Sequence, residues 1–403
     1  MSSDTRARIL VLNQYYWPGV EATGQLLAQL CADLSRDYSI TVITGRLAEP
    51  RADAGRTVHE GVEVVRVRST AFPRRVLALR AVNYLTFLIA SARAALTAPR
   101  PQVVICMTDP PILAIVALAV ARRSRAALVV ISQDVFPEIA ILLHRIENAL
   151  VVRLLRAAIR TYLTRADRVV AIGEKMRGRL EAKGAPAAAL RVIPNWVDTA
   201  ALEEKPRPNA WSRDAGLAES FVVMHSGNVG FTQDLDTLVR SATFLRDLDD
   251  LTIAIVGDGA RRAELLALAD LLEVDHVRFL RYQPRESLPY SLSAADVHVV
   301  GLAPQLSGYV VPSRLYGVLA VGRPVIAAAD ADSETAELVR TIGCGLVVPP
   351  GRPELLAAGI RRAYDGEFDL VDMGRRAREY AVAEADRRVA VSRYRELLAE
   401  LVG

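Results

Sequence analysis

The sequence has few cysteines and no long hydrophobic run. Three cysteines occur among 403 residues, at positions 31, 106 and 344, far apart and inside apolar stretches. No pair has metal-ligand spacing, so we expect buried free thiols in a reducing compartment and exclude a disulfide scaffold. The longest charge-free apolar run near the middle, 112–121, is about half of the roughly 20 residues that a membrane-spanning helix needs.

Several catalytic and targeting motifs are also missing. The sequence contains no GxGxxG, GxxxxGK[ST], GxSxG or HExxH motif and no metal-spaced His/Cys/Asp cluster. We therefore expect no bound metal and no cofactor. Residues 1–13 lack the apolar core and cleavage site of a secretory signal, which predicts a cytoplasmic protein.

Lysine is scarce, and the positive charge is unevenly distributed. Only residues 175, 183 and 205 are lysine, so nearly all of the positive charge is arginine. Residues 1–200 carry 27 Lys and Arg against 16 Asp and Glu, a net +11, whereas the rest carries a net −7. A basic half predicts an anionic partner. Because aromatics make up only 6% and are not interleaved with the charge, nucleic-acid binding is disfavoured.

Strand-like and helix-like patterns alternate along the chain, which predicts parallel sheets covered by helices. The strands expected in the first half are 8–13, 39–44, 62–68, 103–107, 128–132 and 168–172. Those expected in the second half are 221–225, 251–256, 276–280, 296–300, 324–328 and 346–349. The polar segment 203–214 is typical of a linker, and 371–402 is predicted to be helical.

This pattern predicts an α/β protein with two doubly wound, Rossmann-like domains and a central cleft. Ligands of such sheets bind beyond the carboxyl ends of the strands, so the loops that follow the predicted strands are the candidate sites.

Three of these loops contain glycines near a helix start, where backbone N–H groups can contact an anion. The first loop, 13–24, ends with Thr23 and Gly24. The second and third loops contribute the candidates Gly227, Asn228, Gln233, Gly257 and Asp258. For each loop, a plain strand-to-helix turn remains the alternative.

A fourth candidate is the run Val311-Pro312-Ser313-Arg314. Pro312 and Ser313 are typical of a first helical turn, with Ser313 as a candidate cap. A cation at a helix start is disfavoured by the helix dipole, so we expect Arg314 to bind phosphate there.

The fifth candidate, after the strand 128–132, contains Gln133, Asp134 and Glu138. Asp134 is predicted either to be a catalytic carboxylate or to cap the next helix.

Taken in order, these motifs resemble those of the retaining GT-B glycosyltransferases of family 4. The closest resemblance is to bacterial exopolysaccharide and O-antigen transferases, including the colanic-acid and N-acetylfucosamine types. The matching motifs lie at 13–18 (NQYYWP), 192–198 (VIPNWVD), 226–230 (SGNVG), 256–259 (VGDG), 295–297 (ADV), 311–317 (VPSRLYG) and 320–325 (AVGRPV).

The sequence departs from the wider family pattern at several positions. The usual Arg and Lys that bind the donor diphosphate correspond to Asn228 and Gln233. The usual pair of Glu residues corresponds to Tyr309 and Gly317, and the usual His corresponds to Gln133. These differences give Arg314 more weight as the group that supplies the missing charge.

The resemblance implies an enzyme that transfers a sugar, without a metal, from a nucleotide diphosphate sugar to an acceptor hydroxyl. It implies a UDP-sugar donor, of the UDP-N-acetyl-fucosamine type for example, with Tyr282 near the base or ribose. The acceptor domain would be 1–198, with the helix 384–403 packed back on it, and the donor domain would be 199–383.

The basic first half fits an acceptor linked to an anionic polyprenyl diphosphate at the cytoplasmic face of a membrane. The segment 72–97, with Arg74, Arg75 and Arg80 at one end, is predicted to lie on that surface, an ordinary core helix being the alternative. Two other functions remain open: a binding or scaffold protein with a degenerate transferase site, and a nucleotide-sugar 2-epimerase.

Overall fold

A computed structural model describes residues 6–19, 21–47, 51–72 and 77–402. The chain divides into two units: residues 1–194 with 308–310 and 390–403, and residues 195–307 with 311–389. The predicted α/β class and the two Rossmann-like parallel-sheet units are confirmed. The first unit ends four residues before the predicted boundary at 198, and it takes back only the last 14 residues of the chain.

The first unit is built on an eight-stranded sheet of order β3-β4-β2-β1-β5-β6-β7-β8. Its strands are β1 (Arg8–Leu12), β2 (Ser39–Thr44), β3 (Gly55–His59), β4 (Val62–Arg66), β5 (Val103–Met107), β6 (Ala127–Ser132), β7 (Arg168–Ala171) and β8 (Leu190–Val192). The strands are parallel except for β3, which pairs antiparallel with β4. Strand order reverses between β1 and β5, which is the switch point of this unit.

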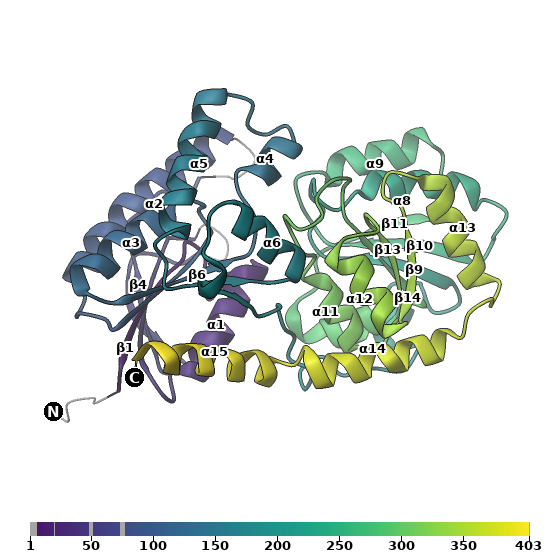
Figure 1. Ribbon diagram of the computed structural model, residues 1–403. Helices are drawn as coiled ribbons and strands as arrows, with labels where there is room; N and C mark the ends of the chain where they lie inside the picture. The colour runs from purple at the N-terminus through teal and green to yellow at the C-terminus, as the bar shows by residue number, and fades with distance from the viewer. Residues whose placement is uncertain (1–5, 20, 48–50, 73–76, 403) are drawn as a thin grey trace. The chain divides into compact units, whose positions relative to one another are not determined.

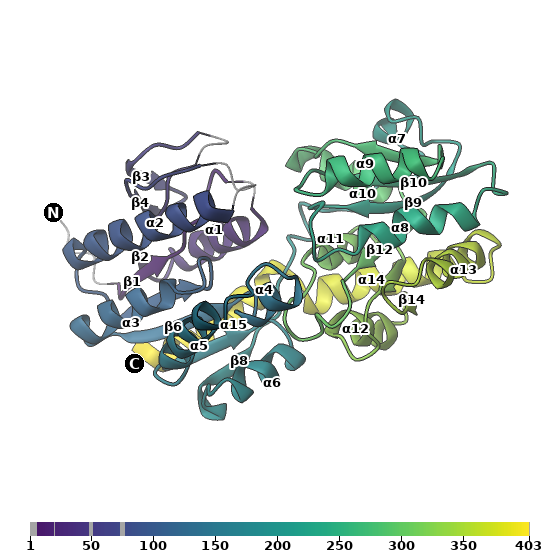
Figure 2. The same cartoon turned by 90° about the horizontal axis from the view of Figure 1, so that it is seen from above.

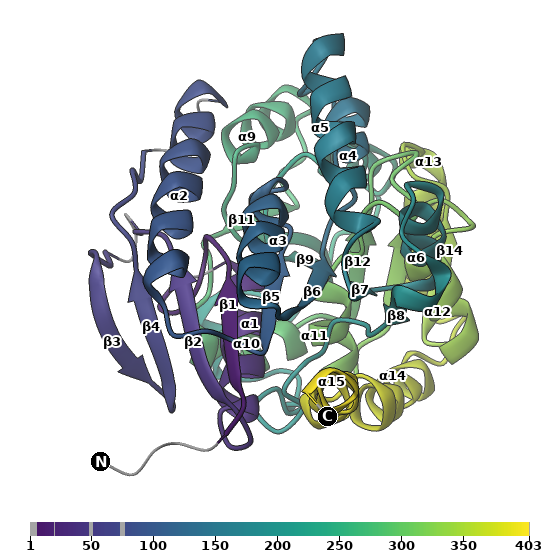
Figure 3. The ribbon, with the colours of Figure 1, turned by 60° about the vertical axis from the view of Figure 1, so that its left-hand side comes forward.

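Helices cover both faces of this sheet. They are α1 (Ala22–Leu34), α2 (Leu77–Thr97), α3 (Leu113–Ser124), α4 (Glu138–Leu142), α5 (Ala149–Leu163), α6 (Glu174–Ala182) and α15 (Arg387–Val402), with a short 3₁₀ turn, η1 (Ala187–Ala189). Figure 3 shows α2, α3 and α5 on the near face, where α3 contacts both neighbours.

The second unit has a six-stranded sheet of order β11-β10-β9-β12-β13-β14. Its strands are β9 (Phe221–Ser226), β10 (Leu251–Val256), β11 (Val277–Leu280), β12 (Val297–Gly301), β13 (Val325–Ala328) and β14 (Gly345–Val348). Each pair of neighbouring strands described in this sheet is parallel. The switch point lies between β9 and β12.

The helices of the second unit surround its sheet (Figures 1 and 2). They are α7 (Ala210–Asp214), α8 (Leu235–Ser241), α9 (Arg262–Leu271), α10 (Leu288–Ser293), α11 (Arg314–Ala320), α12 (Glu334–Ile342), α13 (Pro353–Tyr364) and α14 (Leu370–Glu384), with the 3₁₀ turns η2 (Ala242–Phe244) and η3 (Arg285–Ser287). One apolar core joins the sheet to α8, α9 and α13, and another joins it to α11, α12 and α14.

The segment 203–214, predicted to be a linker, packs on the second unit instead. Arg207 pairs with Asp296 and donates from Nε to the carbonyl of Ala294 at 2.8 Å. Asn209 caps α7 in a reciprocal capping box with Ser212. These polar contacts explain why a polar, proline-containing segment is fixed to the domain.

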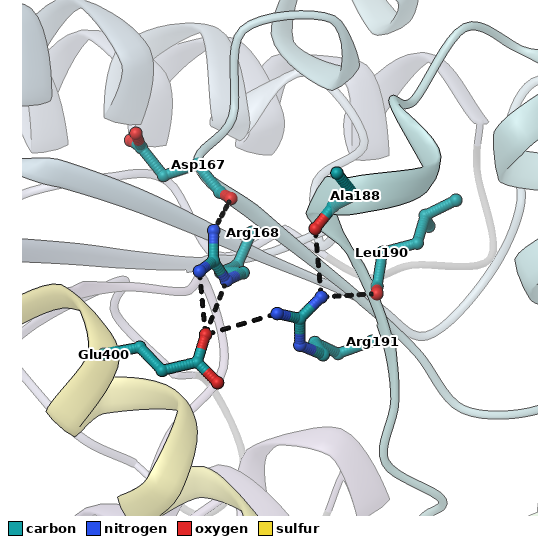
Figure 4. A network of polar contacts seen from close by, with 6 residues as sticks. All are labelled: Asp167, Arg168, Ala188, Leu190, Arg191 and Glu400. Atoms are coloured by element: carbon teal, nitrogen blue, oxygen red, sulfur yellow. Dashed lines mark hydrogen bonds and ion pairs between the residues drawn. The ribbon is translucent and has the colours of Figure 1, made fainter.

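The last helix, α15, contacts the first unit through a polar network at its end (Figure 4) and through a buried apolar face. Glu400 accepts hydrogen bonds from Arg168 Nη2 at 2.7 Å and from Arg191 Nη2 at 3.2 Å. Its inward face buries five apolar side chains, those of Ala390, Val391, Tyr394, Leu397 and Leu398. The first unit is therefore completed by a helix from the other end of the sequence.

Candidate functional site

The loops that follow β9 and β10 are joined backbone to backbone. The N–H of Gly227 donates to the carbonyl of Val256 at 2.9 Å, and the N–H of Val229 donates to that of Asp258 at 2.9 Å. Gly257 has a φ of +147°, and a Cβ at this position would lie 1.9 Å from the carbonyl oxygen of Gly227. Only glycine fits such an approach, so Gly257 has a structural reason to be glycine.

Arg314 lies beside this pair of loops, at the switch point of the second sheet. It is the first residue of α11, and its side chain crosses Gly227, whose built Cβ would lie 3.6 Å from Arg314 Nε. Within the described ranges, no carboxylate lies within ion-pair distance of the guanidinium. Burial lowers the pKa of Arg314 to about 10, which leaves it charged at neutral pH.

The side chain of Arg314 contacts His225, with Nη1 and Nδ1 3.3 Å apart. His225 is fully buried at the end of β9. Burial, and then the charge of Arg314, hold the pKa of His225 well below its usual value. The imidazole is therefore neutral at physiological pH and accepts from Arg314 without neutralising it. A guanidinium without a counter-charge at a sheet switch point can bind an anion.

Two polar side chains that we expected to bind the nucleotide sugar form hydrogen bonds within these loops instead. Gln233 is buried, accepts from the N–H of Gly230 at 3.0 Å, and donates to Thr232 Oγ1 at 2.7 Å. Asp258 Oδ1 accepts from the N–H of Gly259 at 2.7 Å. Asn228 is exposed, and Tyr282, just after β11, is half exposed.

The predicted cap of α11 is wrong. Ser313 has helical backbone angles, φ −60° and ψ −25°, and its side chain makes no capping hydrogen bond. A capping side chain needs an extended backbone at its own residue to reach back to the helix N–H groups. Val311 and Pro312 are buried next to it.

In the first unit, Gly24 packs against the chain itself. The helix α1 begins at Ala22, so Thr23 and Gly24 lie inside its first turn. A Cβ on Gly24 would lie 3.1 Å from the backbone carbon of Tyr15 and 3.3 Å from the nitrogen of Tyr16. We expected a ligand to approach the backbone at Gly24, but the preceding loop of the chain itself occupies that space.

The three candidate residues that follow β6, Gln133, Asp134 and Glu138, make different contacts. Gln133 is buried, and its N–H donates to Thr108 Oγ1 at 3.2 Å. The backbone of Asp134 pairs with Val310, which belongs to the first unit by its contacts. Glu138 forms ion pairs with Lys183 and with Arg156 Nε, the latter at 3.2 Å. Its carboxylate is therefore already neutralised by two cations.

The three cysteines are buried free thiols, as predicted. Burial raises the pKa of Cys31 to about 12, which keeps this thiol protonated. Across the described residues, no cluster of three or more His, Cys, Asp or Glu side chains is arranged to hold a metal ion.

Sequence reasoning singled out Arg314 but missed its contact with His225, because 89 residues separate them. It also missed Arg66, a buried arginine whose side chain fixes the loop after β1. Spacing within a single sequence carries no signal for either contact.

Comparison with known proteins gives two family matches in tandem. Residues 19–196 match the Glycosyl transferase 4-like domain, and residues 209–381 match the Glycosyl transferases group 1 domain. A relative from Escherichia coli K12, named as the colanic acid biosynthesis glycosyl transferase WcaI, is 31% identical over 59% of this chain and 58% of its own length. The chain thus spans less than two thirds of that relative.

A second relative, named as the glycosyltransferase WbjE of Pseudomonas aeruginosa, is 25% identical over 91% of this chain and 92% of its own length. Among solved structures, HepE of Anabaena in complex with UDP and glucose superposes with a TM-score of 0.76 and 18% identity. That match covers 98% of this chain and 100% of the other.

Proposed function

Because the chain belongs to the GT-B glycosyltransferases of family 4 and group 1, we propose that it transfers a sugar from a nucleotide diphosphate sugar. The observation that carries this proposal is Arg314, a partly buried guanidinium without a counter-charge among the described residues, placed across Gly227. When the donor bond breaks, negative charge develops on the leaving diphosphate. A fixed cation at that point stabilises the charge without reorganisation.

We propose UDP as the nucleotide and surface polysaccharide synthesis as the setting. The HepE structure contains UDP and glucose, and the relative from E. coli is named for colanic acid biosynthesis. Retention of anomeric configuration and independence from a metal ion are part of the same proposal. Arg314 supplies positive charge that a metal provides in other transferases.

The proposed acceptor is a glycan linked to an anionic polyprenyl diphosphate. The net +11 charge of residues 1–200 supports this choice. No helix among the described residues is long and apolar enough to span a bilayer. We propose instead that the first unit docks peripherally on the cytoplasmic face of a membrane.

Two helices of the first unit support docking. Leu85 and Ile89 on α2, and Leu150 and Leu154 on α5, are large apolar side chains exposed to solvent. Exposed arginines accompany them, such as Arg153 on α5. This combination fits insertion of apolar side chains among anionic headgroups. Of the basic residues first expected there, Arg74, Arg75 and the side chain of Arg80 lie outside the described residues.

The test is UDP binding by calorimetry, with and without EDTA. We expect binding that EDTA does not change, and an affinity about 30-fold lower in Arg314→Met, since a hydrogen bond to a charged group contributes roughly 2 kcal/mol. The matched control is Arg240→Met, an exposed arginine in α8 of the same unit.

Failure of UDP, GDP, ADP and dTDP to bind would favour the scaffold alternative. If UDP binds, release of UDP that requires an acceptor separates a transferase from a 2-epimerase.

A further inference from the structure

The loop after β1 presents a tryptophan at the carboxyl edge of the first sheet. Trp17 lies five residues beyond the end of β1, whose parallel neighbours are β2 and β5, and β2 is followed by β4. Ligands of open parallel sheets bind at this edge. The side chain of Trp17 is 42% exposed, whereas that of Trp196 is buried.

A buried arginine fixes the backbone of Trp17. Arg66, the last residue of β4, is 7% exposed and donates to the carbonyl of Trp17 at 2.6 Å and to that of Gly45 at 2.8 Å. Within the described ranges, it has no carboxylate partner. Burying a guanidinium with only carbonyl partners is unfavourable, so stability alone is a poor reason for this arrangement. Its effect is to hold the Trp17 loop against the end of β2.

The indole ring is held as well as its backbone. It stacks on His59, at the end of β3, with ring centroids 3.9 Å apart and planes 11° apart. One face is therefore covered, and the exposed area belongs to the other face and the edge. An aromatic ring fixed in advance loses little conformational entropy when a ligand covers it.

We propose that Trp17 is a stacking platform for a sugar ring of the acceptor. A pyranose has a C–H face that packs on the negative face of an indole, while its hydroxyl groups remain hydrated at the rim. The inference rests on the proposed transferase function. It assigns the sugar to the acceptor because Arg314, the proposed diphosphate contact, belongs to the second unit.

The kinetic test uses farnesyl diphosphate carrying a glucosyl, galactosyl or N-acetylglucosaminyl residue as acceptor, with a UDP-sugar as donor. Trp17→Ala is expected to raise the acceptor KM roughly fivefold, since an aromatic contact contributes about 1 kcal/mol. The donor KM and kcat are expected to stay unchanged. Trp17→Phe, which keeps a ring, should restore most of the affinity.

Phe244→Ala is the matched control, because Phe244 is also an exposed aromatic residue but lies in the second unit. We expect it to leave the acceptor KM unchanged. An unchanged acceptor KM in a folded Trp17→Ala protein would overturn the proposal, as would an equal loss in Trp17→Phe.

A binding test separates failure of this inference from failure of the transferase proposal, because it needs no turnover. Trp17 fluorescence should change when the sugar-bearing compounds are titrated, and Trp17→Phe should abolish the change. An equal response to farnesyl diphosphate without a sugar would assign the ring to the lipid chain and refute the sugar platform.

Discussion

Arg66 and Arg314 are both shielded from solvent, but their hydrogen-bond partners differ. Arg66 donates to two carbonyls of its own unit, whereas the side chain of Arg314 contacts a neutral imidazole and has no carboxylate partner among the described residues. The first arginine is satisfied by the fold, and the second keeps its charge available for an anion. Burial lowers the pKa of both. The environment of each residue, and not its type, decides its role.

A buried histidine contributes to the acid sensitivity of the second unit. His298 on β12 is buried, its Nε2 lies 2.9 Å from the carbonyl of Leu292, and burial lowers its pKa to about 4. The unfolded chain takes up this proton near pH 6.5, its usual pKa. The contribution of neutral His298 to the free energy of unfolding is therefore fully present above about pH 6.5. It is lost as the pH falls towards 4. We expect His298→Asn to flatten the decline of the thermal midpoint between pH 7 and 5.

The control for this prediction is His144→Asn, because His144 is exposed in the first unit. It should leave the decline unchanged. A decline in His298→Asn as steep as in the wild type would show that the imidazole is not responsible.

At the scale of elements, α15 is attached to the first unit mainly by apolar packing. Leu398 is fully buried, whereas Glu400, which bridges Arg168 and Arg191, is largely exposed. Exposed ion pairs contribute little to stability, while removing a buried leucine costs roughly 3 kcal/mol. We expect Leu398→Ala to raise amide exchange in α15 about 100-fold and Glu400→Gln to change it slightly. Exchange mass spectrometry measures both, and equal effects would contradict the ranking.

The strands that could be predicted from the sequence are those buried on both faces. β5 and β10 are continuous apolar runs, and the structure has them at the predicted positions. β3 was missed because most of its residues are exposed and its antiparallel pairing leaves no apolar run, and β8 has only three residues.

The candidate site was predicted only in part. The loops were placed at the correct strand ends, but the Ser313 cap and the role expected for Gly24 depend on backbone angles and neighbours that local patterns do not encode. The contact between Arg66 and Trp17 spans 49 residues, and single-sequence spacing cannot reveal it.

At the scale of the whole molecule, the proposed membrane docking is based on the net positive charge of residues 1–200 and on the exposed apolar side chains of α2 and α5. We expect the double variant Leu85→Asn/Leu154→Asn to bind phosphatidylglycerol vesicles roughly tenfold more weakly than the wild type. Raising the salt concentration should weaken binding further, because exposed charges are screened. Vesicle cosedimentation measures this affinity.

The matched control is Leu271→Asn/Val371→Asn, in which both residues are exposed apolar side chains of the second unit. It should bind vesicles like the wild type. If both double variants lost the same affinity, or neither did, α2 and α5 would not be the docking surface.

The placement of α15 has a consequence for how the chain is made. Residues 1–194 are synthesised well before residues 390–403, yet both segments belong to the first unit. At about 5 to 20 residues per second, the interval between the synthesis of these two segments is on the order of 10 to 40 s. During this interval the surface that α15 covers remains exposed, so the first unit completes its fold only after residues 390–403 have been synthesised.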